Sequence, residues 1–105
     1  MLTAEDEKKI RKTIVEALSF QNLGNEVYRR LNDWESIGID ETEFEKYEYI
    51  ISLATEYYIE NDSQDMMIDL FMLLKFKKFD MEGVTVATPI EKQESDFFKK
   101  YNIIL

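Results

Sequence analysis

The chain of 105 residues carries a formal net charge of −9, and 45% of its residues are hydrophobic. That length and apolar content are typical of one domain with a single packed core, so we treat residues 1–105 as one helical unit. The sequence contains no cysteine and no histidine. Disulfides, thiolate or imidazole metal ligands, and catalytic dyads that need either residue are therefore excluded.

The acidic residues are concentrated in one third of the chain. The segment 33–65 holds eleven acids and one base and carries −10, whereas the other residues hold eleven acids and twelve bases and carry +1. A field of one sign over part of a small domain repels nucleic-acid phosphates and anionic membranes, and it attracts a basic partner. The competing interpretation is a solvated helix face that only maintains solubility.

The N-terminal third is expected to form two helices, over 4–22 and 25–36. Thr3 is placed to cap the first helix. Gly24 is expected to end that helix, because glycine readily adopts the left-handed conformation found just after helix ends. Asn25 would then cap the second helix.

The third helix, over 40–60, has the clearest start in the sequence. Asp40 is expected to cap it and Glu43 to complete a capping box, while Ile39 packs on Phe44 as a hydrophobic staple. Apolar residues then recur at helical spacing on one side of this helix. The opposite side carries Glu45, Glu48, Tyr49, Ser52, Glu56 and Glu60.

The segment 66–79, MMIDLFMLLKFKKF, is the most apolar stretch of the sequence. A membrane span needs about 20 apolar residues, and this run is interrupted by Asp69 and ends in lysines, so we expect no span. A helix that is apolar on nearly all sides is normally buried. We therefore expect this fourth helix, capped by Asp62 or Ser63, to be central in the fold.

One narrow strip of the fourth helix is left for contact with water or with a partner. Asp65 and Asp69 are expected to mark where the helix meets solvent. Met72 and Phe76 follow along the same edge at helical spacing. These two side chains are then either covered by the C-terminal tail or exposed as a docking patch.

The C-terminal quarter begins with a turn and a short β-branched stretch at 84–88. A fifth helix should follow to about residue 101, with Thr88 as its cap and Pro89 at its first position. The apolar end, 103–105, should dock on the core or pair as a strand with 84–87. The predicted fold is all-α, or α with a minimal two-strand element, in a small bundle of four to five helices.

No catalytic or ligand-binding motif stands out in the sequence. Acid pairs recur at helical neighbour spacing, but most fall on the predicted solvent side, whereas acid–base catalysis needs carboxyl groups in a cleft. We expect no enzyme activity, cofactor, metal ion, small-molecule substrate or direct nucleic-acid binding. The first residues lack an apolar leader segment, so we expect a cytoplasmic location.

The leading functional hypothesis is an acidic protein-binding module that works through the polar side of the third helix. Its most specific form is an inhibitor of immunity or anti-CRISPR type, which occupies a basic, nucleic-acid-handling surface of a partner such as a nuclease. The residues expected to bind the partner are Glu45, Glu48, Tyr49, Glu56 and Glu60. The alternative is a structural or regulatory subunit, in a homo-oligomer or a larger complex, that docks through Met72 and Phe76 of the fourth helix and through the C-terminal tail.

Overall fold

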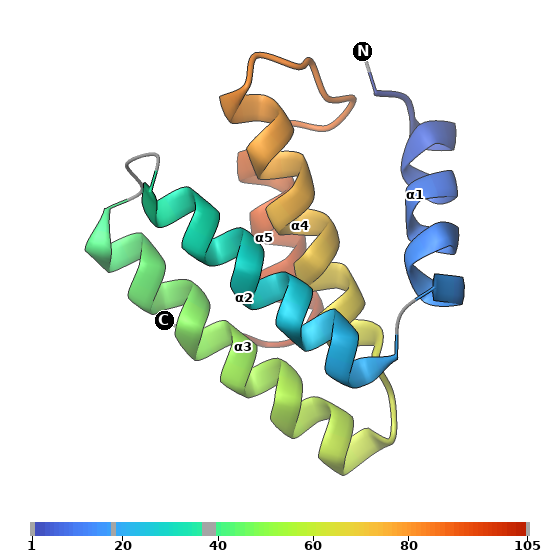
Figure 1. Ribbon diagram of the computed structural model, residues 1–105, viewed down its shortest axis with the longest axis vertical. Helices are drawn as coiled ribbons and strands as arrows, with labels where there is room; N and C mark the ends of the chain where they lie inside the picture. Colours follow the sequence, from blue (N-terminus) through green and yellow to red (C-terminus); the bar gives the residue numbers. More distant parts are fainter. Residues whose placement is uncertain (1, 18, 37–39, 105) are drawn as a thin grey trace.

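A computed structural model describes residues 2–17, 19–36 and 40–104, and it folds them into five helices (Figure 1). They are α1 (Ala4–Ala17), α2 (Phe20–Ser36), α3 (Glu41–Asn61), α4 (Asp65–Met81) and α5 (Ile90–Lys100). Within the described ranges, the only β structure is one parallel bridge between Leu2 and Val86. The all-α prediction is confirmed, and this part of the chain forms no two-strand element.

The long apolar segment recognised in the sequence forms α4. α2 and α3 form an antiparallel pair across one side of α4, and α5 lies behind α4 in the same view (Figure 1). α4 is in contact with each of the other four helices, whereas α1 packs on α4 alone among the helices of the described chain. Nine of the 17 residues of α4 are buried.

The strip of α4 that was expected to remain open is mostly covered. Met72 is 6% exposed and Phe76 is 2% exposed, so both belong to the core and do not form an exposed docking patch. Met72 lines a hollow together with residues of α1 and α5. Asp65 is exposed as expected, whereas the side chain of Asp69 is only 14% exposed and meets solvent less than expected.

The predicted boundary between the first two helices is also wrong. α1 ends at Ala17 and α2 begins at Phe20, so Gly24 lies inside α2 and does not end a helix. Ser19 caps the start of α2: its Oγ accepts a hydrogen bond from the N–H of Asn22 at 3.4 Å. A serine at a helix start satisfies a backbone donor that otherwise lacks a partner.

Gly24 is tolerated in the helix because its neighbours form a continuous buried row. Leu23, Val27 and Leu31 are each at most 1% exposed. A glycine in a helix interior costs about 1 kcal/mol relative to alanine, and burying a single leucine side chain stabilises the fold by about 1.5–3 kcal/mol. The packing of this row therefore outweighs the local preference of the glycine.

α3 begins where the sequence predicted. The Oδ1 atom of Asp40 accepts a hydrogen bond from the N–H of Glu43 at 3.0 Å. The proposed staple residue, Ile39, lies outside the described residues. At the other end, Asp62 takes a left-handed conformation with φ of 51°, and its N–H donates to the carbonyl of Tyr58 at 2.9 Å. Asp62 therefore ends α3 and does not cap α4.

The last two helices start without a side-chain cap. The N-cap of α4 is Gln64, and Ser63 Oγ accepts a hydrogen bond from the N–H of Asp65 at 3.2 Å just ahead of the helix. The N-cap of α5 is Pro89, so the expected cap at Thr88 is displaced by one residue. Proline suits a helix start because no backbone N–H is lost there.

The C-terminal tail folds back from the end of α5. The N–H of Ile103 donates to the carbonyl of Phe98 at 2.9 Å, and the Ile103 side chain packs partly buried against the core. Ile104 is 89% exposed, and residue 105 lies outside the described residues. The expected pairing with 84–87 is not formed by the described tail, because Val86 bridges Leu2 near the other end of the chain.

Candidate protein-binding surface

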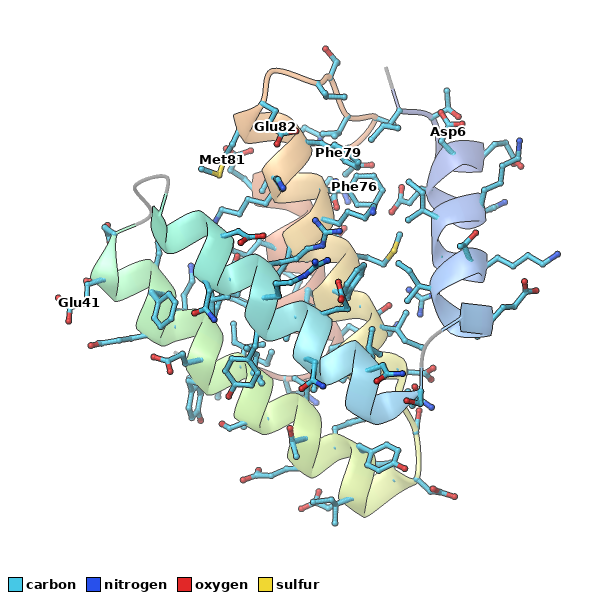
Figure 2. The ribbon with its side chains drawn as sticks, viewed as in Figure 1. Asp6, Glu41, Phe76, Phe79, Met81 and Glu82 are labelled. Atoms are coloured by element: carbon cyan, nitrogen blue, oxygen red, sulfur yellow. The ribbon has the colours of Figure 1, made fainter. Side chains whose placement is uncertain are left out.

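The polar side of α3 forms a continuous exposed surface. We call it the acidic face, and its members, all exposed, are Glu45, Glu48, Tyr49, Ser52, Ile59, Glu56 and Glu60. Glu45 and Glu60 are 15 residues apart, which corresponds to about 22 Å along a helix. Glu41 projects away from the helices at the start of the same helix and adds a further carboxylate (Figure 2). The structure thus places all five predicted binding residues on one side of one helix.

No base among the described residues pairs with the carboxylates of the acidic face. None of Glu45, Glu48, Glu56 and Glu60 forms an ion pair with another residue in the described ranges. Because neighbouring carboxylates on one helix repel each other, this arrangement costs a few tenths of a kcal/mol per pair without contributing to the core. The row therefore carries its full negative potential into solvent.

Two large hydrophobic side chains interrupt the acidic face. Tyr49 is 50% exposed, and Ile59 is 73% exposed. Ile59 was missed as a candidate from the sequence, although it follows Glu56 by three residues and so falls on the same side of the helix. An aromatic and an aliphatic side chain amid charges give a partner apolar area to bury.

A hollow of about 330 Å³ separates α3 from the C-terminal tail, and we call it the tail groove. Tyr49, Glu56 and Glu60 line it from the acidic face, and Ile104 lines it from the tail. Glu45 and Glu48 are not part of its lining, since they lie nearer the start of α3. The structure therefore brings three of the five predicted residues together at a concave site and leaves two on the adjoining convex surface.

The wall of the tail groove is held by contacts to the rest of the fold. The rings of Tyr57 and Tyr101, both in the lining, meet edge to face with centroids 5.3 Å apart. The hydroxyl of Tyr101 donates a hydrogen bond to Asp69 of α4. Asp69 also accepts hydrogen bonds from Arg11 of α1 and, at 2.8 Å, from Lys100 of α5. This carboxylate joins three helices and fixes the root of the tail.

The protonation of these groups reflects that role. Burial alone would raise the pKa of Asp69, but hydrogen bonds from Lys100, Tyr101 and Arg11 outweigh burial and hold the pKa below its ordinary value. Burial and the adjacent Asp69 carboxylate raise the pKa of the Tyr101 hydroxyl. Asp69 is therefore ionised, and Tyr101 remains a hydrogen-bond donor, across the neutral range.

A second polar network binds α3 to α4 and α5 on the side away from the acidic face. The hydroxyl of Tyr47, a fully buried residue, donates to Glu94 at 2.8 Å, and Lys46 donates to Glu94 and to Glu43, both at 2.9 Å. Lys77 donates to Glu43 at 2.7 Å. Burial would raise the pKa of Glu43, but hydrogen bonds from Lys46 and Lys77 outweigh it and lower the pKa. The acids on this side are thus paired, in contrast to those of the acidic face.

A larger hollow, of about 730 Å³, opens on the other side of the tail between α4 and α5. Its charged lining includes Glu43, Lys77 and Glu94 of the network just described. Glu43 and Glu94 are bound to Lys46 and Lys77, so these groups are already engaged within the fold. Within the described ranges, no group of three or more acidic side chains is arranged to hold a metal ion.

Comparisons with known proteins do not assign a family. The sequence matches no protein-family model, and neither the curated proteins nor the solved structures give a significant match. In the part of the chain described here, no helix is both long and apolar enough to cross a membrane.

Proposed function

We propose that this chain is a non-catalytic protein-binding module whose acidic face occupies a basic surface of a partner protein. The observation that supports it best is the contrast between two sets of acids in one small fold. Glu43, Asp69 and Glu94 each contact at least two donors, whereas the carboxylates of the acidic face contact no base among the described residues. A surface kept free of its own counter-charges suits recognition of an external basic group.

The tail groove gives this surface a place to hold one side chain of the partner. A groove of about 330 Å³ accommodates a long side chain but not a helix. Leu53 and the Tyr49 ring offer apolar area to the aliphatic stem of an arginine or lysine. Glu56 and Glu60 then meet its charged head, and the exposed tyrosine ring adds a cation–π contact.

In its specific form, the proposal assigns the partner to the nucleic-acid-handling proteins. Such proteins carry basic grooves that bind phosphates, and a row of carboxylates about 22 Å long competes for such a groove. The chain would then inhibit its partner, as an immunity protein inhibits a nuclease toxin or an anti-CRISPR protein inhibits a host nuclease. A cytoplasmic setting suits this activity, and a cysteine-free chain suits its reducing conditions.

Charge-neutralising variants test the proposal. The face variant Glu45→Gln/Glu48→Gln/Glu56→Gln removes three charges from the acidic face. The matched control Glu5→Gln/Glu16→Gln/Glu91→Gln removes three exposed charges elsewhere, on α1 and α5. We expect the face variant to bind the partner about tenfold or more weakly and with a smaller salt dependence, mainly through slower association. Equal loss of affinity in both variants would show that only net charge matters.

Tyr49 is tested separately, because an anchor acts on dissociation. Tyr49→Ala should leave the association rate unchanged and speed dissociation, at a cost of about 1–2 kcal/mol in binding. Tyr28, which is 45% exposed on α2, provides a matched control as Tyr28→Ala. Indistinguishable dissociation rates for the two variants would remove the anchor role.

The alternative, a structural subunit that docks through α4, finds less support in the structure. Met72 and Phe76 are buried in the folded chain, and among the described residues of the tail Ile104 is the large hydrophobic side chain that is exposed. A complex held by apolar area persists at high salt, whereas one held by the acidic face dissociates. A salt titration of the complex therefore separates the two functions.

A further inference from the structure

Three cations gather where α2 packs on α4, although acids outnumber bases in this chain. The guanidinium carbon of Arg30 lies 5.3 Å from the centroid of the Phe71 ring. The ammonium nitrogen of Lys75 lies 5.9 Å from the same ring and 5.8 Å from the ring of Phe79. Phe79 lies beside Phe76 on the upper half of α4 (Figure 2). Lys78 follows Lys75 by three residues and so projects on the same side of the helix.

The described residues give these cations little compensating charge. Neither Arg30 nor Lys75 has an ion-pair partner in the described part of the chain, and Lys78 reaches Glu82 only at 3.9 Å. Glu26 is the nearby acid that favours the charged form of Lys75, but Glu26 is itself paired with Arg29 at 2.6 Å. A net positive site therefore persists on a protein with formal charge −9.

Two features make this cluster of cations unfavourable as it stands. The Nε atom of Arg30 is buried and has no hydrogen-bond partner among the described residues. Burial lowers the pKa of Lys75, and the positive charges of Arg30 and Lys78 lower it further. A buried donor without a partner and a repelled ammonium are both unfavourable, and an anion bound between the cations would relieve the repulsion at Lys75.

We propose that Arg30, Lys75 and Lys78 form a binding site for one phosphate-type oxyanion, either free phosphate or a phosphomonoester. Arg30 supplies a planar, two-pronged donor that matches the oxygens of a phosphate, and Phe71 holds its guanidinium in place. Lys75 supplies a point charge that is partly dehydrated against two rings, which strengthens its attraction for an anion. Lys78 adds the third positive charge, one turn after Lys75 on α4.

This site is independent of the acidic face. It uses residues of α2 and α4 and none of α3, so the proposed partner binding neither requires it nor predicts it. A phosphate is favoured over a carboxylate because the phosphate dianion compensates more of the three positive charges. Failure of the phosphate proposal would leave the proposed function unaffected.

The test is a titration of the full chain with sodium phosphate at constant ionic strength, balanced with sodium chloride and followed by amide chemical shifts. We expect saturable shifts centred on Arg30 and Lys75, and a rise in the pKa of the Lys75 ammonium when phosphate is bound. Arg30→Gln and Lys75→Gln should each weaken binding about tenfold or more. Lys12→Gln removes an exposed charge on α1 and should change the affinity less than twofold, since its side chain is 77% exposed and remote from α2.

The source of the phosphate is distinguished by a second titration with phosphoserine. Tighter binding of phosphoserine assigns the site to a phosphorylated ligand, and equal or weaker binding assigns it to free phosphate. Shifts that do not saturate, or an affinity that both Gln variants leave unchanged, would overturn the proposal. If Arg30→Gln fails to fold, Lys75→Gln alone tests the proposal. This variant removes the ammonium but leaves the Phe71 and Phe79 rings in place.

Discussion

Replacing Asp69 with alanine should destabilise the fold by removing the polar contacts that connect α4 to α1 and α5. Asp69 of α4 accepts hydrogen bonds from Arg11 of α1, Lys100 of α5 and Tyr101 at the end of α5. Because α1 packs on α4 alone among the helices of the described chain, the Arg11 contact is one of the few polar connections that hold it. The variant therefore tests whether this single carboxylate organises one end of the fold.

The expected cost follows from how deeply each partner is buried. The Asp69 side chain is 14% exposed, whereas those of Arg11 and Lys100 are 39% and 59% exposed, so water readily replaces the carboxylate for the two cations. We assign about 0.5 kcal/mol to each ion pair and about 1–1.5 kcal/mol to the Tyr101 hydrogen bond. The total, about 2 kcal/mol, corresponds to a fall in Tm of about 8–10 °C for a domain of this size.

Urea unfolding followed by circular dichroism measures this loss. Asp96→Ala is the matched control, because Asp96 forms an exposed pair with Lys92 within α5 and should cost less than about 0.5 kcal/mol. Asp69→Asn keeps an acceptor for Tyr101 and should fall between the two. The reasoning is refuted if Asp69→Ala and Asp96→Ala unfold at the same urea concentration.

The stability should also depend on pH through Asp69. Its pKa is lower in the folded chain than in the unfolded chain, so the unfolded state takes up a proton first as the solution is acidified. The stabilisation is complete above the ordinary pKa of an aspartate, about 3.9, and is lost as pH falls through the lower folded value. Wild-type protein should therefore lose stability below about pH 4 more steeply than Asp69→Asn. Parallel curves for the two proteins would contradict this assignment.

Four further substitutions have defined outcomes in thermal or urea unfolding. Tyr47→Phe removes the hydroxyl that donates to Glu94 and should cost about 1 kcal/mol, since Glu94 keeps its bond to a lysine; a neutral effect would contradict the network. Gly24→Ala should stabilise the protein by about 0.5–1 kcal/mol because nothing lies within 4 Å of the added Cβ, whereas Gly83→Ala should destabilise it because φ is 83° there; the same sign for both would refute this. Leu70→Ala should cost about 2–5 kcal/mol because Leu70 is fully buried, and a loss below 1 kcal/mol would place it outside the core.

The features that the sequence predicted correctly are those set by local patterns. The capping residue Asp40 and the apolar content of 66–79 each act within one helix, so spacing alone defined the start of α3 and the burial of α4. The exposure of the acidic face follows for the same reason, because charged residues at helical spacing share one side.

The features that the sequence did not predict depend on contacts between distant segments. Asp65 and Asp69 lie one turn apart on α4, but only Asp69 faces the middle of α1 and the end of α5, where its three donors lie. Likewise Glu43 and Glu45 differ only in the side of α3 they occupy, and it is Lys77, 34 residues further on, that pairs with Glu43. The spacing of residues within one helix does not determine which residues of another helix will contact it.

The boundary between α1 and α2 shows a local signal overridden by packing. Gly24 and Asn25 together read as a helix end and a new start, but the buried row of Leu23, Val27 and Leu31 continues through them. The tail groove was missed for a related reason, because it exists only where Tyr101 and the tail pack against α3. The candidate residues could be named from the sequence, whereas the concave site they form could not.

The most direct test of the proposed function compares three immobilised proteins against a lysate of the native host, with retained proteins eluted in a salt gradient and identified by mass spectrometry. The proteins are wild type, the Glu45→Gln/Glu48→Gln/Glu56→Gln face variant and the Glu5→Gln/Glu16→Gln/Glu91→Gln control. We expect one basic, nucleic-acid-handling protein to be retained by wild type and control, to elute at moderate salt, and to be absent from the face variant. Retention of the same protein by all three, or elution that salt does not change, would contradict binding through the acidic face.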